Sequence, residues 1–188
     1  MFLTLPTLLT WARIVAIPLI VGVFYLPWPQ HDINVLASAL FVVVALTDWL
    51  DGWLARRLNQ TSAFGAFLDP VADKFLVCAS LLILLQLGRV NALVALIIIG
   101  REIAISALRE WMAQIGASRS VAVHMLGKLK TAVQMAAIVL LLLDAPVLGL
   151  FHSRVFGTWL IYVACALTIW SMAYYLKRSL PDIRAKAR

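Results

Sequence analysis

Four aspartates that lie between positions 48 and 73 are the side chains best suited to chemistry in this chain. They are Asp48, Asp51, Asp69 and Asp73, and the whole chain has only nine acidic residues. The first two are three positions apart and the last two are four apart, so each pair shares one face of a helix. Both pairs lie between long apolar segments, where a charged side chain is costly and usually functional.

Two consecutive helices joined by a short polar turn can bring these two pairs together. Carboxylates that lie so close repel one another unless cations sit between them. Carboxylate oxygens are hard ligands that suit Mg²⁺ or Mn²⁺. The sequence therefore predicts a divalent metal site made by all four aspartates. Gly52, Ala55 and Gly65 leave the adjoining wall without bulky side chains, so that a flat or charged ligand can approach the backbone.

The spacing of these residues resembles the signature of the CDP-alcohol phosphatidyltransferase family, D-x2-D-G-x2-A-R-x8-G-x3-D-x3-D. Every fixed position of that pattern is matched by Asp48, Asp51, Gly52, Ala55, Arg56, Gly65, Asp69 and Asp73. Eight fixed residues at fixed spacing make the match far more specific than a short glycine motif.

The resemblance implies a reaction in which an alcohol attacks a phosphorus of a CDP-linked lipid and CMP leaves. It implies two Mg²⁺ or Mn²⁺ ions held by Asp48, Asp51 and Asp69, with Asp73 touching a metal and taking the proton of the attacking hydroxyl. Two such ions would offset the charge of both phosphates.

The resemblance also implies a pocket for the cytidine and the pyrophosphate. Its expected residues are Gly52, Ala55, Arg56 and Gly65, with Thr10 and Arg13 at its border. For Arg13 an alternative is that the side chain simply extends to the membrane interface. One departure from the family pattern is Thr7, at a position often taken by Asn.

Composition places the chain among polytopic membrane proteins. Of its 188 residues 63% are hydrophobic and only 13% are charged, and the mean hydropathy is +0.95. A soluble domain of this length would be nearer half apolar and a quarter charged. We expect an all-α fold with a single domain over residues 1–188. The net charge of +7 reflects membrane topology and does not indicate nucleic-acid binding.

Apolar segments and turn residues predict a bundle of about six transmembrane helices. A short interfacial piece leads into a first helix that ends near residue 27, and the others are expected over 33–58, 63–87, 92–114, 128–143 and 157–176. Residues 144–156 are expected to form a loop, and residues 177–188 a basic polar tail.

The lysines and arginines sort unevenly between the two ends of such a bundle. Only Arg89 and Arg154 fall on one side, and the other side receives nearly all the rest. The positive-inside rule then places both termini, the aspartates and a polar cavity on the cytoplasmic side. The resemblance implies a multi-pass protein of the bacterial inner membrane.

A second basic group bears on the identity of the alcohol. Arg109, Arg119, Lys128 and Lys130 are expected near the same cytoplasmic end, where converging cations suit an acceptor that carries its own phosphate. Glycerol 3-phosphate fits, and residues 101–112 and 127–131 are similar to the branch of the family that uses it. For any single cation the alternative is topological, because cytoplasmic lysines and arginines need no ligand.

The sequence leaves other functions to be weighed. The donor is expected to be CDP-diacylglycerol, but the acceptor could be inositol phosphate, serine or another phospholipid. A divalent-cation transporter would use the same carboxylates as a transit site. Against it, the outer halves of the second to fourth helices are almost wholly apolar. By resemblance alone we expect a homodimer surrounded by membrane lipids.

Overall fold

The structure, a computed structural model, describes residues 5–58, 63–114, 116, 125–147 and 151–186. For some of these, including 48–58, it describes the backbone alone. The elements are α1 (Leu5–Val23), α2 (Gln30–Leu58), α3 (Ala63–Gln86), α4 (Ala92–Gln114), α5 (Met125–Leu143), β1 (Pro146–Val147), β2 (Phe151–His152) and α6 (Ser153–Lys186). The expectation of an all-α fold is confirmed, with one small antiparallel β-hairpin in addition.

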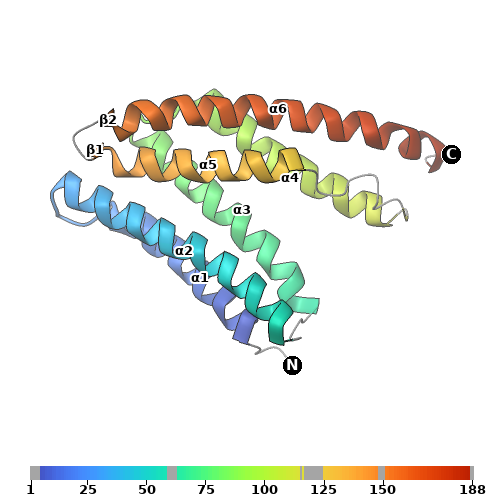
Figure 1. The fold of residues 1–188 in the computed structure, drawn as a ribbon, viewed down its shortest axis with the longest axis horizontal. Helices are drawn as coiled ribbons and strands as arrows, with labels where there is room; N and C mark the ends of the chain where they lie inside the picture. The colour runs from blue at the N-terminus through green and yellow to red at the C-terminus, as the bar shows by residue number, and fades with distance from the viewer. Residues whose placement is uncertain (1–4, 59–62, 115, 117–124, 148–150, 187–188) are drawn as a thin grey trace.

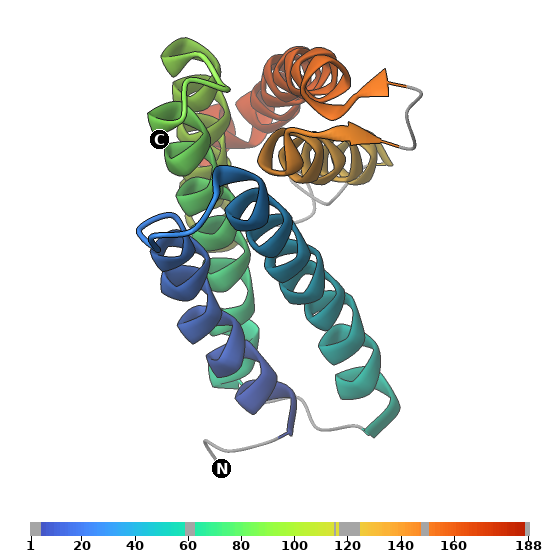
Figure 2. The ribbon, with the colours of Figure 1, turned by 90° about the vertical axis from the view of Figure 1, so that its left-hand side faces the viewer.

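The helices form two groups that meet near the hairpin and diverge from there (Figure 1). In one group α1 packs against α2 and α3, and in the other α6 packs against α5 and α4. Contacts of α5 with α2 and α3 join the groups. Figure 2 shows α5 and α6 nearly end-on, while α1, α2 and α3 run away from them. We call the hairpin end of the molecule the closed end, and the opposite end the open end.

One hydrophobic core joins both groups of helices. Each helix contributes to it, for example through Ile17, Phe41, Leu81, Ile98, Ile138 and Ile161. Because lipid is as apolar as these side chains, their close packing is what holds the helices together in a membrane. The core lies where the two groups of helices meet. Its packing therefore fixes the helices that carry the polar residues of the open end.

The turn between α3 and α4 shows how local sequence fixes the closed end. Gly88 adopts a φ of +64°, the left-handed conformation that ends many helices. The amide N–H of Arg89 donates to the Leu84 carbonyl at 2.8 Å, which satisfies a carbonyl of the last turn of α3. Asn91 then caps α4, because its side-chain oxygen accepts from the Leu93 amide at 2.8 Å.

The contact between α5 and α6 depends on a glycine at the closed end. A Cβ added to Gly157 would lie 2.8 Å from Leu141 Cγ and 3.1 Å from the Leu141 backbone nitrogen. A larger residue there requires that Leu141 or one of the two helices shift. Gly157 therefore lets the first turn of α6 approach the last turn of α5.

The outer surface carries many large apolar side chains, as expected for a membrane protein. Leu19, Phe75, Leu96, Trp159 and Trp170 are each more than half exposed. Such a surface is unfavourable in water but suits lipid. By length and composition, two helices of the described chain are candidate spans, over Gln30–Thr47 and Ser153–Pro181, and Leu8–Val23 and Leu129–Leu143 are shorter apolar stretches.

The structure corrects several predicted boundaries. The first helix is one continuous element and not an interfacial piece followed by a span. Residues 144–156 were expected to be irregular, but they contain the hairpin and the start of α6, where the amide N–H of Ala145 donates to the Ser153 hydroxyl at 2.9 Å. The polar tail is helical to Lys186. Its Lys, Arg, Leu and Ala residues are good helix formers. The polar composition of the tail therefore indicates exposure to solvent and not an irregular backbone.

Candidate functional site

Two of the four predicted metal-binding aspartates lie together on α3. Asp69 and Asp73 are one turn apart, and both side chains are partly exposed. The helix continues through Pro70 between them. The prediction that this pair shares one helix face is confirmed.

Helix α1 supplies a partner for each of these carboxylates. The hydroxyl of Thr10 donates to Asp69 Oδ1. Arg13 Nη1 donates to Asp73 Oδ1 at 2.9 Å, which makes an ion pair. Thr10 and Arg13 are both only 1% exposed. The alternative that Arg13 extends to the membrane interface is therefore wrong, because the buried guanidinium is paired with the Asp73 carboxylate.

The other half of the motif lies on α2, as predicted, but its side chains fall outside what the structure describes. These residues are Asp48, Asp51, Gly52, Ala55 and Arg56. Gly65, in the first turns of α3, is buried. Among the side chains that the structure does describe, no three of the types His, Cys, Asp and Glu converge. The aspartate quartet and the nucleotide pocket stay predictions.

A cavity of about 240 Å³ opens beside Asp73. It is lined by residues of three helices: Pro70, Asp73, Lys74 and Val77 of α3, Glu102 and Arg109 of α4, and Lys130, Thr131, Gln134 and Met135 of α5. Two of the four cations predicted to bind the acceptor phosphate, Arg109 and Lys130, thus share a cavity with the predicted catalytic aspartate. The side chain of Lys128 and the whole of Arg119 lie outside the described residues.

Residues of α4 and α6 hold the two cations Lys130 and Arg109 in position. The Lys130 ammonium, 2% exposed, donates to Glu102 Oε1. Arg101 Nη1 approaches the same carboxylate oxygen at 3.3 Å. The Arg109 guanidinium lies over the Tyr175 ring, with Cζ 5.7 Å from the ring centroid, a cation–π contact. Lys130 and Arg109 are therefore positioned by protein contacts before any ligand binds.

Among the polar residues of the cavity, sequence reasoning gave no role to Glu102 and Gln134. Glu102 was not assigned, and Gln134 was not considered. Gln134 carries the only polar side chain between Thr131 and Asp144 in an otherwise apolar helix. Because polar groups inside membrane helices usually face a cavity or a partner, that isolation was a usable indication. The pairing of Glu102 with Lys130, 28 positions along the chain, carried no such indication.

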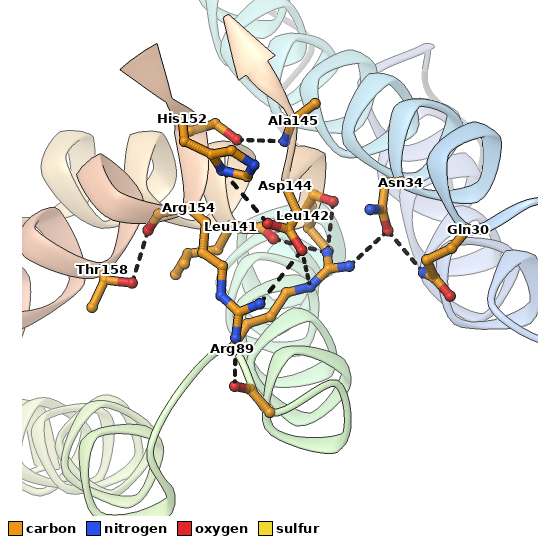
Figure 3. A network of polar contacts seen from close by, with 12 residues as sticks. Gln30, Asn34, Arg89, Leu141, Leu142, Asp144, Ala145, His152, Arg154 and Thr158 are labelled. Carbon is orange, nitrogen blue, oxygen red and sulfur yellow. Dashed lines mark hydrogen bonds and ion pairs between the residues drawn. The ribbon is translucent and has the colours of Figure 1, made fainter.

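A second polar cluster lies at the closed end and centres on Arg89 (Figure 3). Its Nη1 donates to the carbonyls of Leu141 and Leu142 at 3.0 and 2.9 Å. Its Nη2 donates to Asn34 Oδ1 at 3.0 Å, and its Nε lies 3.2 Å from Asp144 Oδ2. All three nitrogens of the guanidinium have partners. Burial lowers the pKa of Arg89 from its ordinary value, and Asp144 opposes that shift.

This second cluster joins elements and does not form a site. It ties the ends of α3 and α5 to the first turn of α2, and Arg154 of α6 adds a donor to the Gly88 carbonyl at 3.2 Å. The cavity at the open end differs, because within the described part of the chain Arg109 Nε and Gln134 Oε1 are buried without a hydrogen-bond partner. Buried polar atoms are normally paired. A small ligand with an anionic group and a hydroxyl would fit the open-end cavity.

Comparison with known proteins gives consistent results. Residues 3–170 match the family model described as CDP-alcohol phosphatidyltransferase. The chain is 45% identical over 181 residues to the CDP-diacylglycerol–glycerol-3-phosphate 3-phosphatidyltransferase of Salmonella choleraesuis (strain SC-B67), which covers 95% of this chain and 96% of the relative. The protein of the same name from Escherichia coli (strain K12) is 46% identical over 183 residues, with the same coverage of both chains.

Proposed function

Because the chain belongs to the CDP-alcohol phosphatidyltransferase family, we propose that it transfers a phosphatidyl group from CDP-diacylglycerol to sn-glycerol 3-phosphate. The products are phosphatidylglycerol phosphate and CMP. The relatives that match along 95% of the chain carry the name of this activity. The observation that supports it in the structure is the cavity that places Asp73 together with Arg109 and Lys130.

In this proposal Asp73 is the group that removes a proton. Its carboxylate lines the cavity and is 43% exposed, so a hydroxyl of the acceptor can reach it. Transfer of that proton to Asp73 makes the oxygen a better nucleophile toward the phosphorus nearer the lipid. The bond from that phosphorus to the oxygen of the CMP phosphate then breaks, and CMP leaves. The ion pair with Arg13 fixes the orientation of the carboxylate.

The acceptor phosphate binds beside the cations of α4 and α5. Lys130 and Arg109 both line the cavity, and charge-assisted hydrogen bonds to phosphate are among the strong ones. Glu102 holds the Lys130 ammonium in place. Lys128 and Arg119 are proposed to extend this basic group.

The described carboxylates fit a divalent metal site. Asp69 and Asp73 offer hard oxygen ligands from one face of α3, the chemistry that Mg²⁺ and Mn²⁺ prefer. We propose that Asp48 and Asp51 complete the site. Ions bound there would supply charge to offset the two phosphates of the donor. Gly52, Ala55, Arg56 and Gly65, bordered by Thr10 and Arg13, are proposed to hold the nucleotide.

The same proposal includes six spans in the bacterial inner membrane, with the open end and both termini at the cytoplasm. The distribution of charge supports this orientation. Arg89 and Arg154, the two residues expected on the outer side, both contact Asp144 at the closed end. Arg109 and Lys130 lie at the open end. A homodimer is proposed by family resemblance, and light scattering of the detergent-solubilised protein tests it.

The activity is tested by measuring CMP release from purified protein in detergent. The protein receives CDP-diacylglycerol and Mg²⁺ together with glycerol 3-phosphate, serine or inositol phosphate. We expect release with glycerol 3-phosphate alone, and loss of release when a chelator removes the metal. Release with serine but not with glycerol 3-phosphate would contradict the assignment. Metal flux into liposomes without CMP release would favour a transporter.

A further inference from the structure

Gln134 occupies a position that the roles assigned so far do not explain. It lies one turn beyond Lys130 on α5, so the two side chains share a helix face. Its side chain is 2% exposed and lines the same cavity as Asp73 and Lys130. Apart from Gln134, the helix is apolar from Ala132 to Leu143, and a glutamine in that stretch is costly unless its amide is hydrogen-bonded.

The amide oxygen of Gln134 is the informative atom. Across the residues that the structure describes, it is one of a few buried polar side-chain atoms without a hydrogen-bond partner. Leaving a buried acceptor unpaired costs about 1–3 kcal/mol. Gln134 lines the cavity, so an occupant that supplies a donor beside this residue would give the buried oxygen its missing partner.

The chemistry of the atom limits which part of a ligand it can bind. A carbonyl oxygen accepts hydrogen bonds and cannot donate them. The oxygens of an ionised phosphate are acceptors as well, so Gln134 Oε1 has nothing to gain from the phosphate of the acceptor. That phosphate is matched by the donors on Lys130 and Arg109. A hydroxyl is the part of glycerol 3-phosphate that can donate.

We propose that Gln134 accepts a hydrogen bond from the hydroxyl on the central carbon of glycerol 3-phosphate. The inference rests on the proposed function, in which the terminal hydroxyl gives its proton to Asp73. The central hydroxyl is then the remaining donor. Gln134 therefore selects acceptors that carry a hydroxyl between the attacking oxygen and the phosphate, a distinction that the basic residues alone cannot make.

The test compares two acceptors that differ by this one hydroxyl. Glycerol 3-phosphate and 3-hydroxypropyl phosphate are each assayed by CMP release, and kcat/KM is measured for both. The wild-type protein should prefer glycerol 3-phosphate by about tenfold, the effect of leaving one buried acceptor unpaired. In Gln134→Met, which keeps the length of the side chain but lacks the amide, the two acceptors should be used equally.

The controls separate a ligand contact from a general effect on folding. Gln86→Met changes an exposed glutamine at the end of α3 and should keep the tenfold preference. Gln134→Leu repeats the removal of the amide with a different shape, in case the methionine variant does not fold.

The outcomes distinguish this inference from the proposed function. If the wild-type protein uses neither phosphate acceptor, the proposed function fails and the inference fails with it. If it uses glycerol 3-phosphate but does not discriminate against 3-hydroxypropyl phosphate, the inference alone is wrong. A preference that persists in Gln134→Met or Gln134→Leu also overturns it, because another group would then bind the hydroxyl.

Discussion

The two buried polar clusters of this protein are built in opposite ways. At the closed end Arg89 has a partner on each of its three nitrogens, and those partners come from α2, from the last turn of α5 and from the residue after it (Figure 3). At the open end Arg109 and Gln134, as far as the chain is described, each keep a buried atom without a partner beside a cavity. A fully paired cluster fixes helices relative to one another, whereas a partly paired one leaves room for a ligand.

The largest effect should come from the open end, at Asp73. Replacing it in Asp73→Asn removes the proton acceptor and should lower kcat by about 10²–10⁴-fold. The neutral amide also deprives the buried Arg13 guanidinium of its anionic partner, so the thermal unfolding temperature in detergent should fall as well. CMP release and a thermal melt of the same sample measure the two effects. Asp69→Asn is also expected to abolish turnover, because it removes a proposed metal ligand.

The matched control for these variants is Asp32→Asn, at an exposed aspartate in the first turn of α2. It should retain full activity. Full activity in Asp73→Asn would remove the basis for treating the open end as the reactive one.

Arg89→Met should show the reverse pattern, a loss of stability with little change in chemistry. It removes one member of a buried ion pair, leaves two carbonyls without their donor and leaves Asp144 with only the longer contacts to Arg154 and His152, which costs about 3–5 kcal/mol. Denaturant unfolding in detergent measures this, with Arg178→Met at an exposed arginine as the control. The surviving enzyme should have normal KM values for both substrates. A changed KM with unchanged stability would mean that the closed end is not merely structural.

Gly157→Ala should weaken the closed end through packing and not through charge. The added Cβ lies within 2.8 Å of Leu141, and overpacking of this kind costs about 1–3 kcal/mol. Gly100→Ala is the matched control, because a Cβ there meets nothing within 4 Å. Equal melting temperatures for the two variants would show that α5 and α6 can separate without cost.

Lys130→Ala should raise the KM for glycerol 3-phosphate by about tenfold, since hydrogen bonds to charged groups contribute more than neutral ones. The KM for CDP-diacylglycerol should change far less. Steady-state kinetics with each substrate varied in turn measure both values. Lys177→Ala, at an exposed lysine of α6, should change neither. Equal increases in both KM values would place Lys130 outside the acceptor site.

The smallest effect is expected at the rim of the closed end. Arg154 is 48% exposed and lies 3.8 Å from Asp144, so solvent screens the pair. Arg154→Ala should change the free energy of unfolding by no more than about 0.5 kcal/mol. The same denaturant titration measures it beside Arg89→Met. A loss of stability as large as that of Arg89→Met would mean that the Arg89 cluster depends on the exposed contact between Arg154 and Asp144.

Local spacing predicted part of this architecture well. The interval between Asp69 and Asp73 fixed their shared face, because helix periodicity requires no knowledge of neighbours. The predicted order of helices and turns placed Arg109 and Lys130 at one end of the bundle. Both predictions depend on positions along the chain, and the structure confirmed both.

Contacts between distant segments could not be predicted in the same way. The pairing of Arg13 with Asp73 and of Arg89 with Asp144 depends on which helices are neighbours and on how far each is shifted along its axis. The periodicity of a single helix carries no such information. The hairpin was missed for a related reason, since its two residue pairs depend on how the end of α5 and the start of α6 lie relative to one another.

The position of Thr10 and Arg13 has a consequence for how the protein can be rearranged. Both α3 carboxylates have partners on α1, so in the proposed function the first helix helps to build the reactive site as well as the bundle. In a hybrid protein that carries the first helix of a distant relative, the residues that contact Asp69 and Asp73 would come from that relative. They would then determine how the two carboxylates are oriented. A shift of α1 by one residue would separate Thr10 and Arg13 from the two carboxylates. We expect such a shift to abolish activity, although the aspartates themselves would not move.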